Sequence, residues 1–195
     1  KKGDSQKEFF KKNLIDPFAR ATRDMNAAKQ KIDNQYDQLK KDYKGLEILV
    51  LILMVISLPL FGFVYLYYNS GNLNFDLPEL PDFVNGLLIG LAIGLLIGQY
   101  VIFHRKLKLS FEYEELFDKV QIYIQATRQR FYFLFLISIL STIGLLFYEN
   151  ATYVVIFALT LIFYSLAKPT PDRIKRLLKL NKEQAEIVRQ ASRPE

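Results

Sequence analysis

The sequence predicts an all-α polytopic membrane protein with four transmembrane helices and both termini in the cytoplasm. Three observations lead to this fold class. The apolar residues gather in four long runs, and charged residues are almost excluded from those runs. All 26 Lys and Arg residues lie outside the runs, on one set of flanking segments. We further expect the first and third helices to extend into a cytoplasmic helical bundle.

The four apolar runs have lengths close to the thickness of a bilayer. They cover residues 46–68, 83–103, 131–148 and 152–167. A membrane span needs about 20 apolar residues, so the first three runs qualify directly and the fourth is short. An Asp, Lys or Arg at the centre of a span costs about 3 kcal/mol, so the near absence of charge is the stronger argument. It argues against the alternative, a soluble protein with buried helices.

The distribution of basic residues predicts the orientation of the chain. Residues 1–45 hold twelve Lys and Arg, residues 104–130 hold six, and residues 168–195 hold eight. The loop 69–82 has none and carries acidic side chains, and the turn 149–151 has none either. Because Lys and Arg are retained on the cytoplasmic side, the three basic segments are predicted to be cytoplasmic and the two others external.

The same bias explains the net charge of +6, so nucleic-acid binding is not predicted. Attraction of the basic segments to anionic lipid headgroups is expected at the cytoplasmic face. The chain has no Cys, which excludes disulfides, thiolate metal sites and thiol catalysis.

Residues 1–45 predict amphipathic helices with a heptad-like seam. Asp16 and Pro17 form a typical helix start. From there an apolar residue recurs every seven positions, in the series Phe18, Met25, Ile32, Leu39 and Leu46. The pattern predicts one helix from about residue 17 to residue 68. We expect Phe18, Met25, Ile32 and Leu39 to form a seam for a cytoplasmic partner.

The two other basic segments also predict helices. A helix beginning near Ser110 would place one set of side chains on a common face, namely Leu109, Tyr113, Leu116, Val120, Tyr123, Ile124 and Thr127. After the fourth span, Thr170 is a good N-cap for a basic amphipathic helix. That helix could lie in the headgroup layer or pack on the other cytoplasmic helices, and the sequence favours neither arrangement.

The second span carries a stripe of glycines four residues apart, here called the glycine stripe. Its members are Gly86, Gly90, Gly94 and Gly98. Small residues at this spacing let two helices approach closely in lipid. Two partners compete: the third span, which offers Ser138 and Thr142 four residues apart, and the same stripe of a second copy.

Few polar groups accompany the spans, and none is a charge near a midplane. Glu47 and His104 lie at the inner edges of the first two spans and could form a pH-sensitive pair. Asn85, Gln99 and Ser138 are the candidates to line a pore. Phosphate-binding glycine loops, zinc patterns and paired catalytic carboxylates are missing from the sequence. We therefore expect no enzyme activity, metal or cofactor.

Two classes of function fit these patterns. The first is a non-catalytic membrane scaffold or complex subunit that assembles through the glycine stripe and the cytoplasmic helices. The second is a homo-oligomeric ion channel or pore, since weakly polar and apolar pores can conduct and gate. The expected partners are lipids and either copies of the same chain or other membrane subunits.

Overall fold

The computed structural model describes residues 16–71 and 77–193, and within them every regular element is a helix. In chain order the elements are α2 (Asp16–Ser70), α3 (Asp82–Leu109), the short 3₁₀ helix η2 (Ser110–Glu112), α4 (Leu116–Tyr148), α5 (Ala151–Ala167), α6 (Pro171–Leu178) and α7 (Lys182–Ala191). The predicted amphipathic start, residues 1–15, and residues 72–76 of the acidic loop lie outside the described residues.

The predicted membrane character agrees with the lengths and compositions of these helices. Among the described residues, three helical stretches are long and apolar enough to cross a membrane: α2, α3 with η2, and α4. The pair α5 and α6, which is bent by 83°, is a fourth candidate if it counts as one broken span. The shortness of the fourth apolar run is thus explained by a sharp bend where the run ends.

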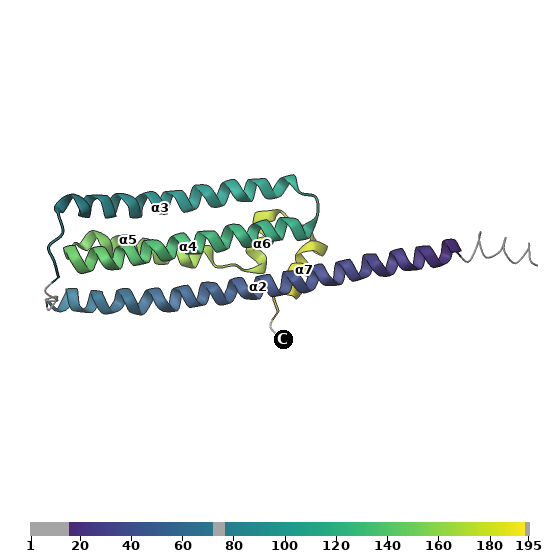
Figure 1. Ribbon diagram of the computed structural model, residues 1–195, viewed down its shortest axis with the longest axis horizontal. Coiled ribbons are helices and arrows are strands. Elements are labelled where there is room, and N and C mark those ends of the chain that lie inside the picture. Colours follow the sequence, from purple (N-terminus) through teal and green to yellow (C-terminus); the bar gives the residue numbers. More distant parts are fainter. Residues whose placement is uncertain (1–15, 72–76, 194–195) are drawn as a thin grey trace, which may run out of the picture.

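Helix α4 lies at the centre of the bundle, with α2 and α3 on opposite sides of it (Figure 1). Fifteen of its 33 residues are buried, against five of 28 in α3. Because α4 is covered from several directions, it provides the surface on which α2, α3 and α5 pack.

Small side chains let α5 approach α4 closely. Gly144 lies against the ring of Tyr153, which is fully buried. A Cβ atom added at Gly144 would overlap atoms of that ring. The Tyr153 hydroxyl is in turn held by Asn85, since it donates a 2.6 Å hydrogen bond to the Oδ1 atom of this residue on α3. The ring therefore has little freedom to move aside.

Helix α2 is a single helix of 55 residues, close to the predicted range. At a rise of 1.5 Å per residue it is about 80 Å long. Its buried residues begin at Leu39, and the first turns of the helix project beyond the bundle (Figure 1). We call residues 16–34 the arm.

The connection between α3 and α4 differs from the prediction. α4 begins at Leu116, not near Ser110, because α3 continues through Leu109 and closes with a 3₁₀ turn. The Ser110 hydroxyl stabilises this turn by donating to the Leu107 carbonyl at 2.6 Å. Leu109 and Tyr113 are consequently 50 % and 47 % exposed, and do not share the buried face of α4.

Helix α6 packs on the bundle through its apolar face. Ile174 and Leu178 are 0 % and 2 % exposed and belong to the main core. Thr170 caps the helix as predicted, since its side chain accepts from the Arg173 amide. The Tyr43 hydroxyl of α2 donates to the Pro169 carbonyl just before this cap, so the bend is tied to α2. We call this end of the bundle, with η2, α6 and α7, the basic end.

The Gly144–Tyr153 contact predicts a strong effect of one methyl group. Gly144→Ala should lower the free energy of unfolding by about 1–3 kcal/mol, the usual cost of overpacking. Thermal unfolding of the purified protein in a mild detergent measures this. Gly94→Ala is the matched control, because a Cβ atom there meets no atom within 4 Å and the helix gains propensity. A Gly144→Ala variant as stable as the control would contradict the contact.

Candidate functional site

The seam on the arm is exposed over most of its length. Phe18, Met25 and Ile32 are 76 %, 71 % and 56 % exposed, whereas Leu39 is 3 % exposed. Successive residues of an α-helix are turned by about 100°, so a step of seven residues changes the direction by only about 20°. Met25 and Ile32 therefore face nearly the same side as Leu39, which packs into the bundle. The exposed side chains of Met25 and Ile32 thus continue a line of apolar residues that is packed into the bundle from Leu39 onward.

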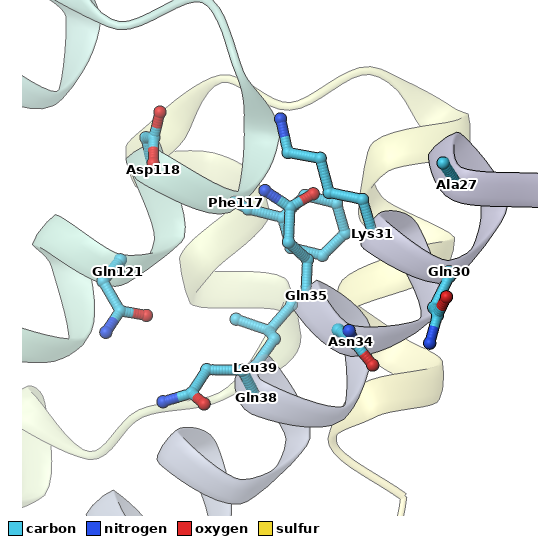
Figure 2. Close-up of a pocket in the computed structure, with 10 residues that line it drawn as sticks. All are labelled: Ala27, Gln30, Lys31, Asn34, Gln35, Gln38, Leu39, Phe117, Asp118 and Gln121. Atoms are coloured by element: carbon cyan, nitrogen blue, oxygen red, sulfur yellow. The ribbon is translucent and has the colours of Figure 1, made fainter. Parts of the chain in front are cut away.

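Two surface pockets flank α2 where the arm leaves the bundle. One has a volume of ≈ 570 Å³ and is lined by Leu39, Gln35 and neighbouring polar residues of α2 together with Phe117 and Gln121 of α4 (Figure 2). The other has a volume of ≈ 680 Å³, and its lining includes Ile32, Tyr36, Leu116 and Ile187. This second pocket lies between α2, the start of α4 and α7, so the seam leads into an apolar recess.

The glycine stripe lies on the outer surface of α3. A Cβ atom built at any of its four glycines meets no atom within 4 Å. The buried residues of α3, including Ala92, Leu96 and Phe103, lie on the opposite face of the helix. Ser138 and Thr142 do not contact the stripe but lie inside the bundle, where their hydroxyls donate to the Leu134 and Ser138 carbonyls of α4. Contact of the stripe with a second copy stays a prediction.

The residues considered for a pore are held by partners within the chain. Asn85 accepts the Tyr153 hydrogen bond, and Ser138 is 1 % exposed and bonds its own helix. Gln99 is also 1 % exposed and pairs with Arg130.

Glu47 and His104 do not form a pair in the structure. Glu47 lies on α2, where it lines a groove with Lys168 and Pro169. His104 lies on α3, and its Nδ1 atom bonds the Tyr100 carbonyl of the same helix at 2.9 Å. The two helices are on opposite sides of α4 (Figure 1), which explains the separation.

A buried arginine on α4 is the polar feature that the sequence analysis missed. Arg130 is 5 % exposed, and its Nε atom donates to Gln99 Oε1 at 2.7 Å. The guanidinium carbon lies 4.9 Å from the ring centre of Phe103 and 6.0 Å from that of Phe163. A guanidinium stays protonated at neutral pH, so Arg130 is a buried positive charge.

The sequence does contain a signal for this burial. Arg130 follows Thr127 by three residues and Tyr123 by seven, and both are 0–1 % exposed. Residues at these spacings share one face of a helix. Because Arg130 also belongs to the basic segment 104–130, its charge has a simple explanation there, and its position on the apolar face of α4 is easily overlooked.

Within the described residues, no group of three or more His, Asp or Glu side chains is arranged to hold a metal ion. No family model, curated protein or solved structure matches the chain. What the protein does is therefore inferred from its own surfaces and side chains.

The open surface of the glycine stripe makes its role testable without disturbing the fold. Gly90→Leu should leave the thermal stability of the single chain unchanged or slightly higher, because a Cβ atom at this position meets no atom within 4 Å and Leu has the higher helix propensity. If the stripe joins two copies, the same change should abolish the oligomer in native mass spectrometry. Val155→Leu, which adds bulk to an exposed position of α5, is the control. An oligomer that survives Gly90→Leu would contradict a stripe-to-stripe contact.

Proposed function

We propose that the protein is a non-catalytic integral membrane scaffold or complex subunit whose arm binds a helix of a different partner chain. The observation that carries this proposal is the exposed seam at Met25 and Ile32, which continues the packed seam at Leu39. The basic end, the arm and both termini are assigned to the cytoplasm, because every Lys and Arg lies on the segments that build this side.

The partner is an amphipathic helix that extends the intramolecular packing beyond the bundle. On α2 the seam is covered by the chain itself from Leu39 onward. A partner helix beneath the basic end would cover Met25 and Ile32 and place an apolar side chain in the pocket beside Ile187. Burying each apolar side chain contributes about 1.5–3 kcal/mol, so Met25 and Ile32 supply part of the binding free energy and the contact in the pocket beside Ile187 has to supply more.

A second copy of the chain is a poor candidate for this position. Copies in one membrane share one orientation, so two arms could pair only in parallel about an axis along the membrane normal. The seam would then face the axis on both chains. Because α2 packs its own bundle on that same side at Leu39 and Leu46, the two bundles would occupy the same space. A helix without an attached bundle avoids this clash.

The channel alternative has less support. The three residues considered for a pore engage other groups of the same chain, and no other observation favours conduction over assembly. Self-association through the glycine stripe is compatible with a scaffold and does not by itself indicate a pore.

Substitutions on the arm test the partner surface directly. Met25→Glu together with Ile32→Glu should weaken binding of the partner at least about 100-fold, since two apolar anchors are lost. Both side chains are exposed, so the fold should be unaffected. The measurement is native mass spectrometry of the complex extracted gently from the host membrane, followed by titration of the purified partner.

Asn26→Glu is the matched control, because it adds a charge at an exposed position of the same turn but off the seam. Support requires a partner chain in fixed ratio that is lost from the double variant and kept by the control. A chain found only as a symmetric oligomer, unchanged by the double variant, would overturn the proposal and favour the channel.

A further inference from the structure

The hydrogen-bonding capacity of the Arg130 guanidinium is only partly used within the chain. Among the described residues, Gln99 Oε1 is the one side-chain acceptor of a hydrogen bond from the Arg130 guanidinium. No described Asp or Glu forms an ion pair with Arg130. A buried charge is costly unless it is paired. Besides the rings of Phe103 and Phe163, the protein supplies one neutral hydrogen-bond partner to this charged group.

The orientation of Gln99 adds a further donor. An arginine Nε–H can only donate, so the amide must turn its oxygen toward Arg130. Its Nε2 atom is then left buried without a partner. Such unmet groups are rare in folded proteins and indicate that a ligand or water completes the site.

A second cation lies near the first. Arg173, at the start of α6, is half-buried, and α6 packs against α4, the helix that carries Arg130. Two arginines held near each other without a carboxylate repel, and an anion between them would remove the repulsion. Packing of Ile174 into the core fixes the helix that carries Arg173, so the two cations cannot simply separate.

We propose that Arg130, Arg173 and the Gln99 Nε2 atom bind a phosphate group where α3, α4 and α6 meet. Guanidinium groups bind phosphate with paired, charge-assisted hydrogen bonds, and the neighbouring Gln99 amide adds a donor. The site does not depend on the partner surface of the arm.

The position of the site along the spans fits a lipid headgroup. Arg130 directly precedes the apolar run 131–148, and Gln99 lies near the end of the run 83–103. Both therefore lie at the depth of the headgroup phosphates. Basic pockets between spans at this level are typical sites for anionic headgroups. A free phosphate ion offers the same chemistry, so the experiment has to separate the two sources.

The test is a thermal-shift titration of the full chain in an uncharged detergent. The probes are dioctanoyl phosphatidylglycerol, dioctanoylglycerol, which has the same chains without phosphate, and inorganic phosphate. We expect the phospholipid to raise the unfolding temperature and dioctanoylglycerol to leave it unchanged. Inorganic phosphate that gives the same saturable shift would identify the free ion as the ligand, and a shift with the phospholipid alone would identify the headgroup.

Arg130→Gln and Arg173→Gln should each weaken the apparent affinity about tenfold or more, because each removes a charge-assisted hydrogen bond. Arg176→Gln is the matched control, since Arg176 is an exposed arginine of the same helix. Arg173 is only half-buried, so its variant remains informative if Arg130→Gln fails to fold. Unchanged affinity in Arg173→Gln, or an equal loss in Arg176→Gln, would overturn the proposal.

Discussion

The close packing of α4 with its neighbours is the constraint on which the rest of the structure depends. Lipid tails are as apolar as Leu, so helices in a membrane associate through tight contact and hydrogen bonds and not through a hydrophobic drive. α4 meets this need with a run of small residues that ends at Gly144. The tyrosines of α5 that fill the resulting space also reach α2 and α3: Tyr164 lies 3.4 Å from the Ser57 hydroxyl, and Tyr153 bonds Asn85. Two helices on opposite sides of α4 are thereby linked through α5.

The features of the fold that could be predicted are those determined by neighbouring residues in the sequence. The length of each apolar run and the exclusion of charge identify the long helices, and the cap at Thr170 identifies the start of α6. The turn between α3 and α4 could not be located in this way. Apolar residues continue through Leu109, and the reversal is completed by a serine that looks equally suitable as a helix start.

The candidate sites show a similar division. The heptad spacing identified the seam, but where the bundle stops covering it depends on where α4 and α7 end in space. The glycine stripe was recognised from its spacing, yet α3 is apolar on nearly all sides, so nothing local indicates which face packs inward. Arg130 was hidden because a single basic residue beside a span has an obvious explanation in membrane orientation. Only its register with Tyr123 and Thr127 marks it as different.

The continuity of α2 has a mechanical consequence. The arm and the first span form one helix of 55 residues that continues through Gly45, and its one proline, Pro59, lies well beyond the middle. A force that tilts or rotates the arm would therefore also tilt or rotate the membrane segment of α2, because no flexible joint separates the two. The hydrogen bond from the Tyr43 hydroxyl to the Pro169 carbonyl attaches α2 to the chain near the bend between α5 and α6. A partner bound to the arm, as proposed above, would therefore act on the orientation of the bundle through the stiffness of one helix.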